Sequence, residues 1–246
     1  MKLIILGSSS AGNCYLLDNG KEALMIECGV PFRDVKKAMD FDITRISACI
    51  VSHEHGDHAR YVKDVMKSRI PLVMSEGTAD ALGLPSNTMV IRSEACKLKR
   101  FGGFKVKPFK VMHDCAEPFG YLISHPETGT ILFATDTCYL EQKFRGLNNI
   151  LLECNYDTKI LEDNVAKGVL PDFLANRTVK SHMSLETCIR TLQANDLSAV
   201  NNIVLIHLSP GNSNAVVFKA QVEVATGKNV IIAQKGLSIE FNKDPF

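Results

Sequence analysis

Three histidines and two carboxylates occupy six consecutive positions within the SHEHGDH segment, residues 52–58. Imidazole nitrogens and carboxylate oxygens bind zinc and similar divalent ions, and catalytic metal sites keep one position open for water. A loop of solvated histidines is the alternative, but clusters of this kind seldom lack a function. The segment therefore predicts a hydrolytic metal site.

Spacing within the segment predicts two adjacent metal sites. His53 and His55 point to the same side of an extended loop, because side chains alternate with a period of two, so both can reach one ion. Gly56 then permits a tight turn. The turn brings Asp57 and His58 to the start of a helix, where they face a point beside the first ion.

The elements that position this loop can be predicted from periodicity. The apolar run at 45–51 is typical of a buried strand, and residues 59–68 have helical periodicity, so the loop follows the carboxyl end of a strand. Further strands are expected near residues 2–6, 13–17, 23–26, 71–74, 88–91, 96–101, 104–109, 121–124, 130–134, 149–152, 200–206, 230–233 and 237–241. Further helices are expected near residues 31–39, 76–82, 158–170, 184–193 and 212–226.

The HxHxDH pattern resembles that of the metallo-β-lactamase fold superfamily. Three later residues, each after a β-like apolar run, match the remaining ligands of the superfamily: His113, Asp136 and His207. The resemblance implies a first metal ion held by His53, His55 and His113, a second held by Asp57, His58 and His207, and Asp136 bridging the two.

Two metal ions about 3.5–4 Å apart can share a hydroxide, because the pKa of bound water falls from about 15.7 to roughly 7. Such a site, with Asp57 among its catalytic groups, suits hydrolysis of a phosphodiester, ester, thioester or lactone. Zinc is the expected metal, and manganese would also bind these ligands. Secreted β-lactamases of the superfamily typically have cysteine where Asp136 stands, so the resemblance is to the phosphodiesterase, nuclease and glyoxalase-like branches.

A second segment, residues 181–184, precedes a predicted helix and resembles a segment of nuclease branches such as RNase Z. There a histidine donates a proton to the leaving oxygen or orients the scissile phosphate, and the resemblance implies this catalytic role for His182. Glu153, at the end of its strand, is predicted to orient His182. The alternative is a segment that only caps the helix.

Several segments together resemble the small YycJ-like (WalJ-like) branch: residues 7–13, 113–115, 134–137, 153–156 and 207–209. This resemblance spans nearly the whole chain and implies a nuclease acting on DNA ends. Glu27 departs from the branch, which more often has an aspartate there to support the metal loop. A dinuclear metal phosphodiesterase with a nucleic-acid substrate is the leading interpretation.

Two other functions stay open. One is hydrolysis of a small ester, thioester or lactone, as in glyoxalase II, with a pocket too narrow for a polynucleotide. The other is a binding module that keeps the metals without turnover. It is disfavoured because every ligand position of the pattern is filled.

Length and composition predict one domain over residues 1–246. Strands leading each half suit an α/β (α+β) fold, the four-layer αββα sandwich of two mixed sheets with helices outside. The net charge of +1 favours no class of partner, and no apolar run suits a membrane. Eight scattered cysteines fit a reducing cytoplasm, and the oligomeric state is open.

Several surface features have two interpretations. The loops at 7–13 and 207–214 could hold an anion, or could be a tight turn and a helix cap. A lysine-rich hairpin with Phe101 and Phe104 near its turn could contact nucleic acid, or could be a protected sheet edge. The spacing of Cys115 and Cys138 is only weak evidence that either cysteine approaches the metals. His125 is expected to be a solvated turn residue.

Overall fold

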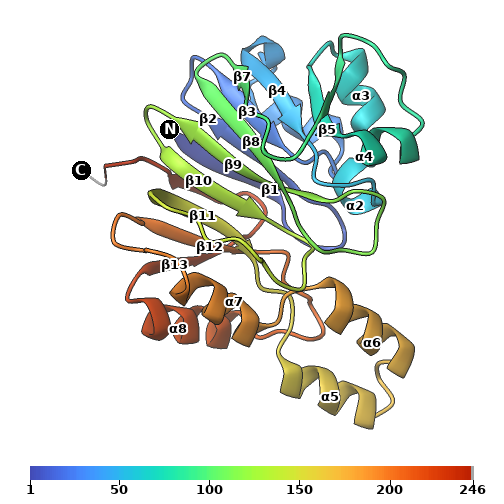
Figure 1. Cartoon of the computed structure of the whole chain (residues 1–246), viewed down its shortest axis with the longest axis vertical. Helices are drawn as coiled ribbons and strands as arrows, with labels where there is room; N and C mark the ends of the chain where they lie inside the picture. Colours follow the sequence, from blue (N-terminus) through green and yellow to red (C-terminus); the bar gives the residue numbers. More distant parts are fainter. Residues whose placement is uncertain (245–246) are drawn as a thin grey trace.

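The computed structural model describes residues 1–244 and contains two seven-stranded mixed sheets (Figure 1). In the first sheet, the first three neighbouring pairs are antiparallel and the last three are parallel. Its spatial order is β14 (Ser238–Glu240), β1 (Lys2–Gly7), β2 (Cys14–Asp18), β3 (Ala23–Ile26), β4 (Ile46–Ile50), β5 (Leu72–Ser75) and β6 (Val90–Ser93).

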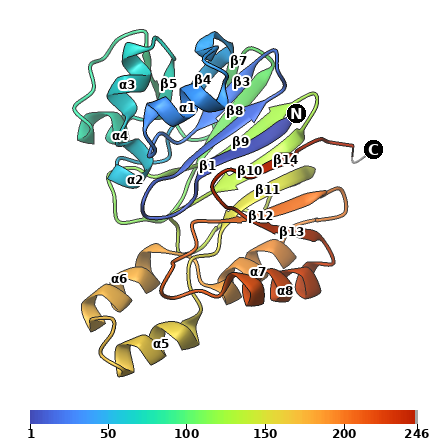
Figure 2. The same cartoon turned by 180° about the vertical axis from the view of Figure 1, so that it is seen from behind.

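The second sheet is parallel on one side and antiparallel on the other. Its spatial order is β13 (Asn229–Ile232), β12 (Asn202–Ile206), β11 (Leu147–Glu153), β10 (Gly129–Ala134), β9 (Phe119–His125), β8 (Phe104–Lys110) and β7 (Lys99–Phe101). The chain enters this sheet after β6 and returns to the first sheet at β14 (Figure 2).

Helices cover the outer face of each sheet. On the first sheet lie α1 (Phe32–Ala38), α3 (Val62–Lys67) and α4 (Glu76–Ala81), with the short α2 (Gly56–Ala59) at its edge. On the second sheet lie α7 (Leu185–Gln193) and α8 (Ala215–Thr226). A 3₁₀ turn, Ile43–Arg45, leads into β4. The predicted four-layer αββα sandwich is therefore confirmed.

The two sheets are joined by an apolar core between their inner faces. Strand β8 shows the pattern that builds it, because Phe104 and Val106 are fully buried while Lys105 and Lys107 face outward. From the neighbouring strand, the hydroxyl of Tyr121 donates a hydrogen bond across the core to the carbonyl of Val51, at 2.7 Å. The core therefore also anchors Val51, the residue directly before the metal-site loop, residues 52–58.

Strand direction gathers the predicted site at one edge of the sandwich. Strands β3 and β4 are parallel to each other, as are β10, β11 and β12. All predicted site residues except His182, which follows a helix, end or follow these strands and β8, and such ends meet at one edge of a sheet. Residues far apart in the chain therefore converge without long loops.

Most expected elements are present, with two informative differences. The expected helix at 59–68 begins only at Val62, as α3, and the short α2 precedes it from Gly56, because the amide of Tyr61 donates to the carbonyl of Cys28 instead of continuing α2. The second difference is α6 (Asp172–Ser181), a helix that periodicity did not predict. With α5 (Thr158–Ala166) it forms a helical arm that projects beyond the sandwich (Figures 1 and 2). Within residues 1–244, every helix is too short or too polar to cross a membrane.

Replacing Phe133 with alanine should lower the free energy of unfolding by about 3–5 kcal/mol, because it deletes a fully buried ring that packs edge-on against Tyr15 in the core between the sheets. Urea unfolding followed by circular dichroism measures this change. Val224→Ala, at an 89% exposed position on α8, should alter the free energy by less than about 0.5 kcal/mol. Equal losses in both variants would contradict the placement of the core.

Candidate metal centre

The metal-site loop begins directly after β4 and ends in α2. His53 and His58 are buried, whereas His55 and Asp57 are partly exposed and face the pocket. A β-carbon at Gly29 would lie 1.7 Å from the carbonyl oxygen of Asp57, so only glycine allows this close approach of the two backbones. The loop is thus seated directly against the segment that follows β3.

Asn13 also holds this loop, and sequence reasoning missed its role. Its backbone amide donates to the carbonyl of Asp57 at 2.7 Å, and its side-chain amide lies 3.3 Å from the carboxylate of Asp57 and 3.1 Å from Nε2 of His58. The sequence left the loop at 7–13 open between an anion site and a tight turn. The amides of Gly12 and Asn13 donate to Ser9 and Asp57 within the protein, which favours the tight turn.

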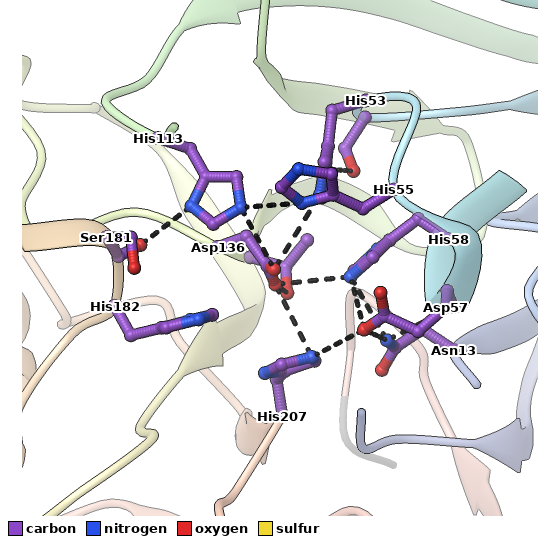
Figure 3. Close-up of polar contacts among 12 residues, drawn as sticks. Asn13, His53, His55, Asp57, His58, His113, Asp136, Ser181, His182 and His207 are labelled. Carbon is purple, nitrogen blue, oxygen red and sulfur yellow. Dashed lines mark hydrogen bonds and ion pairs between the residues drawn. The ribbon is translucent and has the colours of Figure 1, made fainter. Parts of the chain in front are cut away.

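Three residues from the second sheet complete the cluster (Figure 3). His113 follows β8, Asp136 follows β10, and His207 follows β12. Asp136 and His207 adopt left-handed backbone conformations, with φ of 45° and 55°, which aspartate and histidine tolerate better than most residues. These turns direct both side chains from the strand ends into the space between the sheets, as the close-up shows.

The cluster contains three overlapping groups of four possible ligand atoms, and all atoms of a group lie within 4.8 Å of one another. Two groups consist of the predicted ligands: His53, His55, His113 and Asp136 in one, and Asp57, His58, Asp136 and His207 in the other. The third contains Asp136, Glu153, His182 and His207, so Asp136 belongs to all three. Its Oδ2 lies 3.7 Å from Nε2 of His53 and 3.5 Å from Nε2 of His113, while its Oδ1 lies 3.3 Å from Nε2 of His58 and 3.6 Å from Nε2 of His207.

These separations fit ligands around a metal ion. Four ligands at 2.0–2.2 Å around tetrahedral zinc are about 3.4 Å apart, which is close to the spacing observed here. Nε2 of His53 is buried and has no hydrogen-bond partner among the described residues. An orphaned imidazole nitrogen facing a carboxylate is costly unless a ligand satisfies it. The cluster is therefore capable of binding metal ions.

Buried partners fix the ring orientations of the histidines. Nδ1 of His113 lies 2.9 Å from the carbonyl of Ser181, and Nδ1 of His53 lies 2.8 Å from the hydroxyl of Ser52. Each contact leaves Nε2 directed at Asp136. Contacts of this kind hold metal-binding histidines in one tautomer and orientation.

Glu27 supports the second group from behind. Its fully buried carboxylate accepts a hydrogen bond from the amide of Ser52 at 3.1 Å and lies 3.5 Å from Nδ1 of His58. Burial raises the pKa of Glu27, against the opposing effect of His58. The glutamate therefore reaches both the metal loop and a ligand histidine, as the aspartate more common in the YycJ-like branch was expected to do.

Glu153 is the corresponding carboxylate of the second sheet, and it pairs with His182 as predicted. Its Oε1 lies 2.7 Å from Nδ1 of His182 and 3.5 Å from Nδ1 of His207, and its Oε2 accepts from the amide of Thr137. The ring of His182 stacks on that of His207, with centroids 5.5 Å apart and planes inclined by 9°. His182 thus lies beside the cluster. The cap of the following helix is Ser184, whose hydroxyl accepts a hydrogen bond from the amide of Thr187.

Charge pairing sets the protonation of the cluster in the absence of metal. Burial alone would raise the pKa of Asp136, but the imidazoles of His207 and His58 hold it well below its usual range. Burial would likewise lower the pKa of His207, yet the Asp136 carboxylate and the hydrogen bond with Asp57 raise it to about 10. In contrast, burial and the charge of His58 lower the pKa of His53 well below its ordinary value.

The cluster opens into a pocket of about 300 Å³, one wall of which comes from the helical arm. The lining residues are Ser10, His55, Asp57, His113, Asp136, Leu170, Leu174, Arg177, Thr178, Ser181, His182 and His207. Helix α6 therefore faces the candidate metal site, although its residues gave no signal in the sequence.

Other expected site residues lie elsewhere. Phe104 is fully buried and Phe101 packs against the core, so neither ring is free to stack a base, and the hairpin fits its other interpretation, a protected sheet edge. The amide of Gly103 in their turn donates to Glu22, just before β3, whereas the metal loop follows the carboxyl end of β4, which runs parallel to β3. His125 is buried, 3.2 Å from Glu22, and so is not the solvated residue expected.

The two cysteines near the site and the second expected anion loop also have other roles. Cys115 and Cys138 belong to neither ligand group, and burial raises the pKa of Cys115 to about 12. In the loop at 207–214, the side chain of Asn214 accepts hydrogen bonds from the first amides of α8. The helix-cap interpretation of that loop is thus confirmed.

The fold and the cluster together define a metal-dependent hydrolase of the metallo-β-lactamase fold. The chain resembles the metallo-beta-lactamase fold protein YhfI from Bacillus subtilis with a TM-score of 0.72 and 16% identity, over 97% of this chain and 99% of that one. It belongs to the family described as the beta-lactamase superfamily domain, whose model matches residues 24–208.

Two curated relatives resemble this chain in sequence. Exodeoxyribonuclease YycJ of Bacillus anthracis is 26% identical over 224 residues, covering 85% of this chain and 83% of the relative. Exodeoxyribonuclease WalJ of Streptococcus pneumoniae serotype 2 is 27% identical over 248 residues, covering 85% and 91%. The predicted YycJ-like branch is therefore confirmed as the one this chain resembles.

The metal-free protein should become less stable as the pH rises above about 6.5, and zinc should reverse that trend. The pKa of His207 is raised from 6.5 to about 10, so its stabilising contribution is present below pH 6.5 and is lost as the pH rises toward 10. The expected decrease is about 1 kcal/mol per pH unit for each protonated imidazole. Metal ions bind the neutral imidazole, so stabilisation by zinc should instead increase with pH.

Urea unfolding at about pH 6.5 and about pH 8.5, with chelator or with zinc, tests this expectation. His207→Gln should reduce the pH dependence of the chelator-treated protein, because it removes one of the imidazoles whose pKa is raised. A metal-free protein that is more stable at the higher pH would contradict the charge pairing described here.

Proposed function

We propose that this chain is a phosphodiesterase that cleaves nucleic acid at its ends, with two divalent metal ions in the two ligand groups. His53, His55 and His113 would hold the first ion; Asp57, His58 and His207 would hold the second; and Asp136 would bridge them. The nitrogen and oxygen donors favour zinc, and manganese also fits them. When bound, such ions supply an activated water and neutralise charge on the scissile group.

The observation that carries this proposal is the pairing of His182 with Glu153 beside the cluster, at 2.7 Å. The carboxylate accepts the Nδ1 proton, which leaves Nε2 as the nitrogen available to a ligand in the pocket. Burial would lower the pKa of His182, but the charge and hydrogen bond of Glu153 raise it above its ordinary value, which favours the protonated imidazole. It is thus suited to donate a proton to a leaving oxygen.

A proton donor matters most when the leaving group is a poor one. The sugar oxygen released from a nucleic-acid phosphodiester is strongly basic, and protonation lowers the cost of its departure. The names of the relatives support the same class of substrate, since both are exodeoxyribonucleases.

All eight cysteines are free, which supports a cytoplasmic location.

Purified protein loaded with zinc or manganese should shorten end-labelled DNA, and Asp136→Ala should abolish this activity, because that substitution removes a ligand from both groups. Gel analysis of single- and double-stranded DNA and RNA with either label shows the preferred substrate and the direction of cutting. Metal content measured beside activity gives the control. A protein that binds two metals and hydrolyses small esters or thioesters, but cuts no nucleic acid, would favour the glyoxalase II-like alternative.

His182→Ala should reduce phosphodiester cleavage about 10²- to 10⁴-fold while metal content is unchanged, because His182 is expected to donate a proton and not to bind metal. The loss should be much smaller for bis(p-nitrophenyl) phosphate, whose leaving group needs no proton. Glu153→Gln should give an intermediate loss and a lower apparent pKa on the alkaline limb of the rate profile. Equal losses for good and poor leaving groups would exclude proton donation by His182.

A further inference from the structure

The helical arm carries a second hollow next to the candidate metal site. Helix α6 presents Leu174, Thr178 and Ser181 to the metal-site pocket, at the spacing of one helical face. Along its neighbouring edge is a hollow of about 430 Å³, lined by Asp114, Phe173, Asn176, Arg177, Lys180 and Ser181. Arg177 and Ser181 line both spaces, so the hollow adjoins the pocket that contains the metal-ligand cluster.

The end of α6 is fixed to the metal-ligand cluster. The carbonyl of Ser181 lies 2.9 Å from Nδ1 of His113, and Nε of Arg177 donates to Asp114, the residue after His113, at 2.6 Å. These contacts hold the hollow at a constant position relative to the cluster. The hollow is thus placed to receive whatever part of a substrate extends past the metals.

Phe173 is exposed without a structural reason. It is 71% exposed, whereas the two helices of the arm pack together through a small apolar cluster of Tyr156, Leu161 and Ala175. The arm therefore does not need the Phe173 ring for its own stability. An aromatic ring left in solvent beside a functional pocket is available to pack against a ligand.

The charges around the hollow suit a phosphate backbone. Lys180 is exposed, and the two terminal nitrogens of Arg177 have no hydrogen-bond partner within residues 1–244. Asp114 would repel an anion, but its carboxylate is already paired with Nε of Arg177. Arg177 and Lys180 thus outweigh Asp114 by one positive charge, and an aromatic ring beside a net positive charge is the combination that binds single-stranded nucleic acid, by stacking a base and contacting phosphates.

We infer that this hollow binds the nucleotide next to the scissile phosphate of a single-stranded end, with Phe173 stacked on its base and Arg177 and Lys180 at its phosphates. The position of the scissile phosphate in this inference rests on the proposed function. The base must be unpaired, because both faces of a base inside a duplex are covered by its neighbours. The hollow therefore favours single strands or frayed ends over blunt duplexes.

Equilibrium binding isolates the hollow from the chemistry. The probe is a fluorescein-labelled phosphorothioate oligodeoxynucleotide of about 12 nucleotides, a length within the range that single-strand sites cover. Phe173→Ala in the metal-loaded protein should weaken binding of the single strand about tenfold, with little effect on a blunt duplex. Val169→Ala, at an equally exposed position on the same arm but outside the hollow, is the matched control and should bind like the wild type.

Lys180→Ala gives a second, independent measurement. Loss of one phosphate contact should reduce the slope of log affinity against log salt concentration by roughly 0.7. Hydrolysis of bis(p-nitrophenyl) phosphate, which needs only the metal-site pocket, should be unchanged in both variants. Equal thermal unfolding of the variants and the control excludes damage to the fold.

The outcomes separate the two proposals. Binding of the single strand that depends on Phe173, without cleavage of any phosphodiester, would overturn the proposed function and leave the inferred binding site standing. Cleavage of DNA with unchanged binding by Phe173→Ala would overturn the inferred site and leave the function. A wild-type protein that binds no oligonucleotide would also overturn the inferred site. So would a Phe173→Ala variant whose affinities for the single strand and for the duplex fall equally.

Discussion

The carboxylate of Asp136 is the group on which the arrangement of the site depends. It is 3% exposed, and its two oxygens face different sets of histidines, with separations of 3.3 to 3.7 Å. A single buried negative charge thus lies within reach of imidazoles from both sheets. Burial of that charge is costly unless cations or metal ions compensate it, so the cluster has a strong electrostatic reason to bind metal.

Two further buried carboxylates extend this arrangement, one from each sheet. Glu27 follows β3 and lies against His58, while Glu153 ends β11 and lies between His182 and His207. Each also accepts a hydrogen bond from a backbone amide next to a site residue. Glu27 accepts from Ser52, before His53, and Glu153 accepts from Thr137, after Asp136. The same side chains therefore orient the imidazoles and hold the loops that carry them. Because Glu153 contacts both histidines, a change in the charge of one affects the other.

Much of the fold could be predicted because the relevant signals are local, and the candidate ligands could be placed because they match the ordered pattern of the metallo-β-lactamase fold superfamily. The run before His53 and the strands before Asp136 and His207 are apolar and short, and the ligands stand directly after them. Asn13 could not be predicted, because its role depends on a contact with Asp57, forty-four positions later, which only the folded chain creates. Whether the Phe104 ring faces solvent or the core stayed open for a similar reason. Its strand alternates inward and outward residues, but the sequence does not say which face meets the other sheet.

Helix α6 shows where pattern reading fails and why. Within it only Ala175 and Ser181 are buried, so it has no apolar stripe with the period that identifies a helix packed on a core. Its larger apolar side chains, Phe173 and Val179, remain largely in solvent. A helix whose residues are retained for packing would bury such side chains. One that keeps them exposed beside a metal-ligand cluster is better explained by what it contacts during function, and the contact between Ser181 and His113 makes that surface continuous with the site.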